Sequence, residues 1–337
     1  MKKTILTLGI LAAYGVSQAA TPVHRPLIEE YTGLWCEWCT RGFVAMELIE
    51  EKYGNDQVTI SYHQNDAMAV TNTFPVSFLG VPVATIDRQD LIDPYYGKKE
   101  PQDFAITEEI EKAMAVPTNV AIDVVAELDG SKVIATSTAC FTEDIDKANY
   151  QIGYILIGNN LSNNKWLQAN GYDQYRDKPT FKGTHLEVLT TWGSYVRGLV
   201  FNDVVIDASA MMGVNNSLPA YLVADEEYTH SYTFNIGSNP LVNDPQDLGV
   251  AVFVVNKNTK RVVNANKFFF KPRNAEGTGN EEENGILDVE LEAGVAGVEY
   301  YNLAGQKVSD PVPGVFIRVE TLENGMRRSE KVLIPNQ

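Results

Sequence analysis

Two cysteines separated by two residues, Cys36 and Cys39, are the side chains of this chain best suited to covalent chemistry. They lie in the run Trp-Cys-Glu-Trp-Cys, behind a strand-like stretch and ahead of residues with the apolar spacing of a helix. Such a pair at a helix start can close a disulfide, and the unpaired N–H groups of the first turn stabilise a thiolate on the first cysteine. The sequence therefore predicts a redox-active dithiol, with Cys36 as nucleophile and Cys39 as resolving thiol.

Two other interpretations of the pair stay open. A structural zinc site needs two further Cys or His ligands, but the sequence has no second C-x-x-C. The histidines are scattered singly along the chain, at His24, His63, His185 and His230. We therefore expect no metal. A purely structural disulfide in a binding module is the stronger alternative. The third cysteine, Cys140, lies in a strand-like run, where a buried small apolar residue is the simpler interpretation and a resolving thiol the other.

The first residues predict export. Lys2 and Lys3 precede an apolar segment, residues 5–16, that is too short to span a bilayer, and small residues follow it. We interpret residues 1–20 as a signal peptide and expect the protein in the periplasm, at the outer membrane or at the cell surface. The formal net charge of −17 argues against nucleic acid as a partner.

A length of 337 residues exceeds what one hydrophobic core usually organises, so we expect several domains. Residues 21–116 alternate strand-like and helix-like segments, which is typical of an α/β domain. Residues 117–271 carry short strand-like runs separated by turn residues, which predicts an all-β sandwich. An acidic linker at 272–285 precedes a small β module at 286–337. The expected fold class is thus α+β and multidomain.

The first domain resembles the thioredoxin family. The resemblance rests on the run Trp35–Cys39, the helix-like residues after it, and Val81-Pro82 ahead of a later strand. In that family the proline is cis and packs against the disulfide, which implies that Val81 and Pro82 shape a substrate groove. Trp35 and Trp38 would flank the same groove. The domain is thus expected to have a thioredoxin-like fold.

An acidic residue completes the resemblance. Thioredoxins carry a buried acid behind the second cysteine, and Glu30 occupies that position, six residues before Cys36. A carboxyl group in an apolar strand has a raised pKa and can accept the proton of Cys39. Glu29 should point to the opposite face, because strand side chains alternate. His63 ends a strand-like run and could face the pair, but we expect it to serve as an ordinary hydrogen-bonding residue outside the catalytic set.

The wider chain resembles the 28-kilodalton outer-membrane-protein family of Gram-negative bacteria. The matching features are the signal peptide, the Glu-Glu-Tyr-Thr-Gly before the cysteines and Tyr195-Val-Arg-Gly-Leu in the β-rich part. The tail resembles the C-terminal sorting domain of type IX secretion cargo in the runs that start at Gly297, Gly314 and Glu330. That resemblance implies an address for outer-membrane or secretion machinery.

These features predict an exported thiol–disulfide oxidoreductase that acts on extracytoplasmic protein thiols or disulfides and needs no cofactor. The alternative is an outer-membrane or cell-surface binding or adhesion protein whose disulfide is only structural. A low pKa and an exposed sulfur at Cys36 favour the enzyme, whereas a buried bridge that resists reduction favours the binding protein.

Overall fold

The computed structural model describes residues 22–69, 74–99, 103–271, 295–301, 307–308, 314–322 and 327–334, with side chains up to residue 271 and at 297–300 and 307–308. The chain divides into two compact units, Met1–Gly279 and Asn280–Gln337. The predicted signal peptide and the predicted linker lie outside the described residues.

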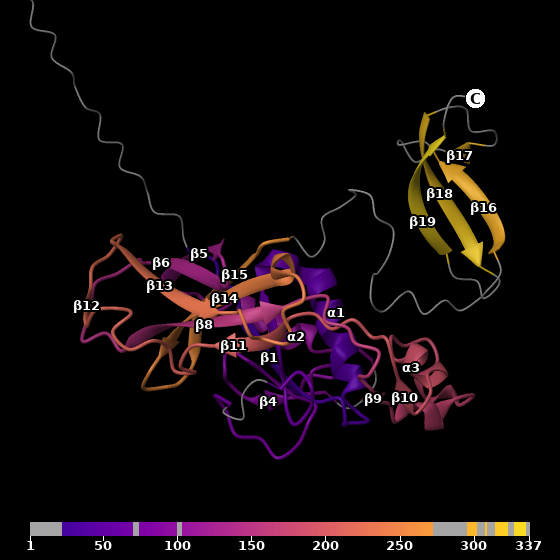
Figure 1. Cartoon of the computed structure of the whole chain (residues 1–337), viewed down its shortest axis with the longest axis horizontal. Coiled ribbons are helices and arrows are strands. Elements are labelled where there is room, and N and C mark those ends of the chain that lie inside the picture. Colours follow the sequence, from indigo (N-terminus) through magenta and orange to yellow (C-terminus); the bar gives the residue numbers. More distant parts are fainter. Residues whose placement is uncertain are drawn as a thin grey trace, which may run out of the picture. The chain divides into compact units, whose positions relative to one another are not determined.

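The first unit is mixed α/β, mostly sheet, with few helices among its described residues (Figure 1). Its helices are α1 (Thr40–Tyr53), α2 (Thr107–Met114) and α3 (Glu187–Thr191), with 3₁₀ turns at Gly54–Asp56, Tyr172–Tyr175, Pro179–Phe181 and Pro245–Asp247. Its strands are β1 (Leu27–Thr32), β2 (Val58–His63), β3 (Val83–Ile86), β4 (Leu91–Ile92), β5 (Val120–Asp129), β6 (Lys132–Phe141), β7 (Ile145–Asp146), β8 (Tyr150–Gly158), β9 (Gln168–Ala169), β10 (Tyr195–Val196), β11 (Val204–Ala208), β12 (Tyr221–Leu222), β13 (Glu227–Asn235), β14 (Leu248–Asn256) and β15 (Val262–Phe269).

Among the described residues, eight strands form a main sheet in the order β15, β14, β8, β11, β2, β1, β3 and β4. β1 and β2 run parallel, and α1 supplies the crossover that a parallel pair requires. Every residue of β1 and β2 is buried, the polar ones included, as expected for strands covered on both faces. β11 also runs parallel to β2, with Val204 opposite Ser61, so strands on both sides of the boundary expected at residues 116–117 belong to one sheet.

A second sheet, in the order β13, β6 and β5, packs on the β14 and β15 end of the main sheet. Buried residues alternate with half-buried or exposed ones along β6 and the first half of β5, which shows that one face of this sheet is more covered than the other. Asn264 and Asn266 of β15 donate side-chain hydrogen bonds to the carbonyl oxygens of Val120 and Ile122 in β5, at 2.8 Å each. The β-rich part of the chain therefore forms a sandwich in which one layer continues into the sheet that carries β1.

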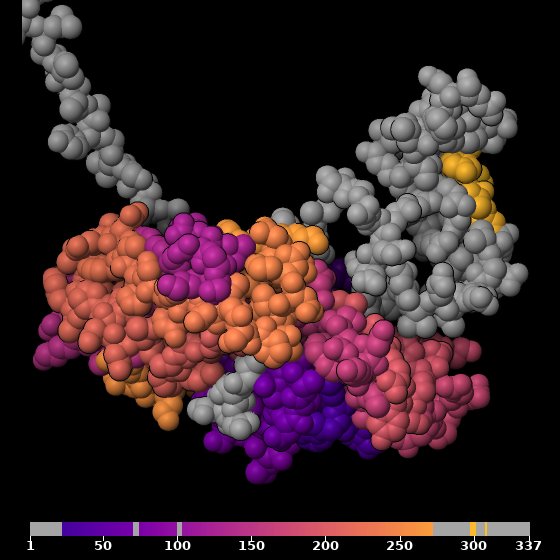
Figure 2. All heavy atoms as spheres, viewed as in Figure 1, coloured from indigo at the N-terminus to yellow at the C-terminus, as the bar shows by residue number. Residues whose placement is uncertain are grey.

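A long excursion, residues 159–203, connects β8 to β11 and carries β9, β10 and α3. It lies beside α1 at one end of the main sheet (Figure 1), and its rose-coloured atoms adjoin the indigo atoms of the segment that contains α1 in the space-filling view (Figure 2). The main-chain N–H of Ala169 donates to the carbonyl oxygen of Leu34 at 2.8 Å. This contact places the excursion directly against the loop that bears the cysteines.

The second unit contains an antiparallel sheet in the order β17 (Lys307–Val308), β16 (Val295–Tyr301), β18 (Gly314–Leu322) and β19 (Arg327–Ile334). A strand-rich tail was expected from its sequence. A membrane-spanning helix would need a longer apolar stretch than any helix in the described part of the chain provides.

Candidate functional site

The cysteine pair occupies the connection between β1 and α1. Cys36 and Cys39 form a disulfide with a Cα–Cα distance of 5.3 Å. Consecutive turns hold them in place, because the N–H of Cys36 donates to Gly33 O at 3.1 Å and that of Cys39 to Cys36 O at 3.2 Å. Cys39 is the residue just before α1, and its carbonyl accepts the N–H of Phe43 at 3.0 Å. The bridge thus sits at the positive end of the helix dipole.

Burial distinguishes the two cysteines only slightly. Cys36 is 6% exposed and Cys39 is 1% exposed, so the disulfide lies below the surface. The Sγ atom of Cys36 lies 3.4 Å from the carbonyl oxygen of Val81, and the Val81–Pro82 peptide bond is cis. The loop ahead of β3 therefore reaches the first cysteine.

The two tryptophans of the motif lie in different surroundings. Trp35 is 53% exposed, and its indole N–H donates to the carbonyl oxygen of Gln64 at 2.8 Å, which fixes the ring at the surface. Trp38 is half-buried and packs edge-on against Tyr172 of the excursion, with ring centroids 5.5 Å apart. Trp35 therefore presents its ring to solvent, whereas Trp38 packs against the excursion.

Residues 168–172, which we call the strap, run along the connection between β1 and α1, residues 33–39, which we call the cysteine loop. The N–H of Gly171 donates to Glu37 O at 2.8 Å, and the side-chain amide of Gln168 donates to Cys36 O at 3.1 Å. A Cβ atom on Gly171 would meet the Trp38 ring at 3.3 Å, so a glycine allows this close approach. The strap satisfies carbonyl groups of the cysteine loop and covers one side of it.

Glu30 lies beneath the first turn of α1. Its Oε2 accepts a hydrogen bond from the Ser61 hydroxyl at 2.7 Å, and the side chain is 2% exposed. A Cβ on Gly42, one turn after Cys39, would lie 2.0 Å from Glu30 Oε1, so the glycine makes room for the carboxyl group. Burial raises the pKa of Glu30 to about 7; the Ser61 hydroxyl opposes this rise, the Asp93 carboxylate adds to it, and Thr32 and Arg41 oppose it.

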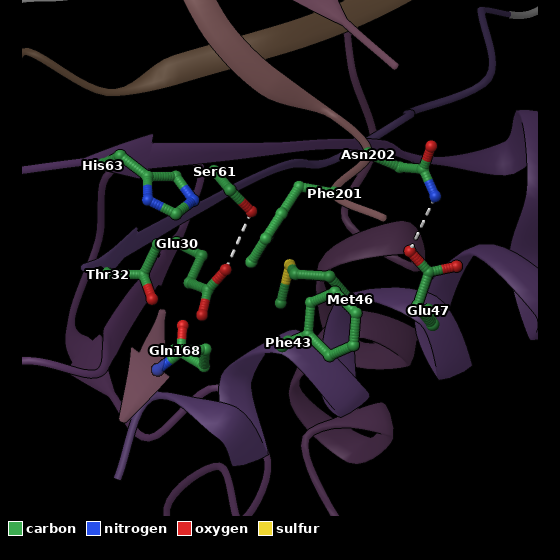
Figure 3. A pocket seen from close by; sticks show the side chains of 10 residues that line it. All are labelled: Glu30, Thr32, Phe43, Met46, Glu47, Ser61, His63, Gln168, Phe201 and Asn202. Atoms are coloured by element: carbon green, nitrogen blue, oxygen red, sulfur yellow. Dashed lines mark hydrogen bonds between the residues drawn. The ribbon is translucent and has the colours of Figure 1, made fainter. Parts of the chain in front are cut away.

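A small cavity of about 20 Å³ adjoins the Glu30 carboxyl group (Figure 3). Glu30 Oε1 is buried and has no direct hydrogen-bond partner of good geometry among the described residues. β1, β2, α1 and the excursion all contribute to the lining: Glu30, Thr32, Ser61, His63, Phe43, Met46, Glu47, Gln168, Phe201 and Asn202. In Figure 3 the amide oxygen of Gln168 points toward the carboxyl group of Glu30.

His63 also lines this site, although its place at the end of a strand-like run predicts only an ordinary hydrogen-bonding residue. It is 4% exposed, lines the cavity, and its Nδ1 lies 2.8 Å from Asp66 Oδ2. Asp66 also accepts the N–H groups of Leu34 and Met68 at 2.8 Å each, so it links β2 to the cysteine loop. The spacing His-x-x-Asp directly after a strand is the sequence signal that could have identified this pair.

Other candidate residues lie elsewhere. Glu29 faces away from Glu30, as strand alternation predicts, and forms a buried ion pair with Arg88 at 3.0 Å. Cys140 is a half-buried free thiol in β6 of the second sheet, and burial raises its pKa. Within the described residues, no three or more His, Cys, Asp or Glu side chains gather as a metal site would require.

Comparisons with known proteins give no family assignment. No family model matches the chain, and no curated protein matches it. Among solved structures it is similar to HBP35 of Porphyromonas gingivalis, with 16% identity, a TM-score of 0.48, and coverage of 94% of this chain and 99% of that one. A structural-genomics protein from Agrobacterium tumefaciens has 13% identity and a TM-score of 0.40, with coverage of 77% and 100%.

A third similar structure is a domain of the outer-membrane lipoprotein Omp28 from Porphyromonas gingivalis. It has 14% identity and a TM-score of 0.25, with coverage of 48% of this chain and 95% of that domain. All three scores lie below 0.5, so none of these similarities carries an argument about this chain.

Proposed function

We propose that this protein is an exported, thioredoxin-like thiol–disulfide oxidoreductase that acts on extracytoplasmic protein thiols or disulfides. One observation carries the proposal: the Cys36–Cys39 disulfide lies at the start of α1, and a buried carboxyl group with a pKa of about 7 lies under the first turn of that helix. A helix start favours a thiolate on Cys36, and a carboxyl group with a pKa near neutrality can exchange the proton of Cys39.

The reaction in the reducing direction has two steps. The Cys36 thiolate attacks one sulfur of a substrate disulfide, which forms a mixed disulfide, and the other substrate sulfur leaves as a thiolate. Cys39 then gives its proton to Glu30 and attacks Cys36 Sγ, so the internal disulfide forms and the second substrate sulfur leaves. Two electrons pass from the dithiol to the substrate, and an external dithiol must re-reduce the enzyme. The same steps in reverse oxidise a substrate dithiol.

The surroundings of Cys36 support access by a polypeptide. Trp35 is exposed on one flank, and Val81 and Pro82 lie on another, with the Val81 carbonyl 3.4 Å from Cys36 Sγ. Leu79, at the surface of the same loop, is fully exposed. An exposed aromatic ring next to Cys36 in the chain and an exposed leucine two residues before Val81 fit a protein substrate better than a small polar thiol. We propose that the β-rich tail, residues 286–337, directs the protein to outer-membrane or secretion machinery.

The redox equilibrium of the cysteine pair tests the proposal. The mature protein with Cys140→Ser is equilibrated against a dithiothreitol or glutathione series, and free thiols are alkylated and counted by mass. We expect a reversible two-electron transition in the native state, with Cys36 alkylated first. A bridge that stays closed under strong reductant until the protein unfolds would contradict an exchange enzyme.

The burial of the disulfide favours a second candidate function. With Cys36 at 6% exposure and the strap bonded along one side of the loop, the bridge could serve only to brace a surface binding or adhesion protein. In that case the same titration gives reduction coupled to loss of near-ultraviolet circular dichroism. The two candidates thus differ in whether reduction leaves the native fold intact.

A further inference from the structure

The proton that Cys39 gives to Glu30 must leave this buried carboxyl group before Glu30 can accept another. We propose that His63, held by Asp66, exchanges this proton with Glu30 through one water molecule in the cavity that both side chains line. The inference rests on the proposed function, because it supplies the proton route of that site. It assigns a role to a histidine for which strand position alone predicted only a structural hydrogen bond.

The register of β1 and β2 places the groups together. Glu30 lies opposite Ser61 and Thr32 lies opposite His63 in this parallel pair. Residues two apart on a strand share a face, so all four side chains lie on the face covered by α1. The cavity is bounded by these side chains on the sheet and by Phe43, Met46 and Glu47 on the helix. Glu30 and His63 therefore line one small cavity.

The cavity has the size and polarity that a bound water needs. A volume of about 20 Å³ holds roughly one water molecule, which also needs two to four polar partners. Glu30 Oε1 is buried and has no direct hydrogen-bond partner of good geometry among the described residues. The amide group of Gln168 donates to Cys36 O and Ala169 O, so its oxygen is left as an acceptor, and it points toward Glu30 (Figure 3). His63 engages Asp66 through Nδ1, which leaves Nε2 for the water.

Asp66 prepares His63 to take the proton. Burial opposes ionisation of Asp66, but hydrogen bonding and charge interaction with His63, together with the N–H groups of Leu34 and Met68, lower its pKa. The resulting carboxylate, 2.8 Å from Nδ1, accepts the N–H of that nitrogen, so Nε2 of the neutral ring is an acceptor for a proton. The Ser61 and Thr32 hydroxyls cannot hold an additional proton near neutral pH, whereas an imidazole can.

The proposed step is a balanced proton transfer. The carboxyl group of Glu30 loses a proton to the water, and the water passes a proton to Nε2 of His63, which leaves a carboxylate and an imidazolium. No electrons move in this step. The other charged groups near Glu30 are Arg41 and Asp93, which form an ion pair at 2.6 Å, and Glu47, which accepts a hydrogen bond from Asn202 at 3.1 Å.

Site-specific NMR titration of the full-length oxidised protein tests the inference. The Glu30 carboxyl carbon and the His63 ring nitrogens are followed from pH 4 to 9 in the wild type and in His63→Asn, which keeps a hydrogen-bond donor for Asp66. We expect the two wild-type curves to be coupled and to share macroscopic midpoints. Loss of the imidazolium should raise the Glu30 midpoint by roughly half a pH unit or more. In the reduced protein, the resolving step at pH 7 should slow by roughly tenfold.

Two control variants make the outcome decisive. His185→Asn removes an exposed histidine that also pairs with an aspartate, Asp103, and Glu47→Gln removes the other ionisable group of the cavity. Neither should move the Glu30 midpoint as His63→Asn does. Independent single-step wild-type curves would overturn the inference even if His63→Asn fails to fold, and so would an equal shift in Glu47→Gln. These titrations use the oxidised protein and do not depend on redox activity. A failure of the proton route can therefore be distinguished from a failure of the proposed function.

Discussion

Glu29 and Glu30 are neighbours in β1, yet their carboxyl groups lie in different electrostatic environments. Glu29 is paired with Arg88 in a buried ion pair, whereas Glu30 is buried beside a serine hydroxyl and the first turn of a helix. The first carboxylate has a full positive partner, and the second lacks one. We therefore expect the two residues to affect stability with opposite signs.

The raised pKa of Glu30 predicts that the protein becomes less stable as the pH rises. Its value of about 7 in the folded state exceeds the ordinary value of 4.5, so the folded state binds the proton more tightly. The resulting stabilisation is full below pH 4.5 and is lost as the pH rises through 7, a change of about 3 kcal/mol in the free energy of unfolding. Glu30→Gln should thus unfold within about 1 kcal/mol of the wild type at pH 5 and be more stable by about 3 kcal/mol at pH 8. Guanidinium unfolding of the oxidised protein measures both values.

Glu29→Gln is the matched control for that variant. It leaves the Arg88 guanidinium buried without its carboxylate, which typically costs about 3 to 5 kcal/mol. The loss should be present at both pH 5 and pH 8. If both glutamine variants changed the free energy of unfolding in the same direction at pH 8, the assigned environments of the two carboxyl groups would be wrong.

At the scale of elements, the approach of α1 to β1 depends on one glycine. Alanine is normally the better helix former by about 1 kcal/mol. At position 42, however, the new Cβ would lie 2.0 Å from Glu30 Oε1, so the helix or the carboxyl group must shift. Gly42→Ala should therefore destabilise the protein by about 1 to 3 kcal/mol. In a Glu30→Ala background, the same change should be neutral or stabilising, and thermal unfolding of the four proteins in this cycle checks the coupling.

The strap gives a second prediction at this scale. Gln168 donates to Cys36 O and Ala169 O, and the strap amides of Ala169 and Gly171 donate to the cysteine loop. Gln168→Ala removes a buried donor and leaves carbonyl groups less satisfied, at a cost of about 1 to 3 kcal/mol. We expect faster hydrogen exchange at residues 168–172 and faster alkylation of reduced Cys36, with exchange in β14 unchanged. Unchanged exchange at the strap would mean that it does not depend on this side chain.

Several elements were predictable because their signals are local. The buried run before the cysteines predicted β1, and the apolar spacing from Phe43 predicted α1. The strap was not predictable, because its contacts with the cysteine loop join residues more than a hundred positions apart that carry no shared motif. The partner of His63 was not predictable, because a strand sequence does not say which side chain its final residue contacts. Asp66 reaches His63 only through the turn after β2.

At the scale of the whole molecule, the main sheet decides how the chain can be divided. Composition changes near residue 116, and this change predicted separate domains. In the structure, β11 pairs with β2, and Ile155 and Phe253 share a buried cluster with Leu27 and Val58. Lys267 of β15 is 2.7 Å from Glu50 of α1, and both side chains are almost fully buried. The residues on the two sides of position 116 therefore share one core.

This shared core predicts how fragments behave. Residues 21–116 alone would expose the edge of β2, the apolar side chains that share a cluster with residues of β8 and β14, and the Glu50 carboxylate without its lysine. A fragment that loses this much burial lacks a sufficient core. We expect residues 21–116 to show no cooperative thermal transition, and residues 21–271 to unfold in one transition when followed by both far- and near-ultraviolet circular dichroism. A cooperative transition in the short fragment would instead establish an autonomous redox domain, in which the continuation of the sheet adds stability without defining the fold.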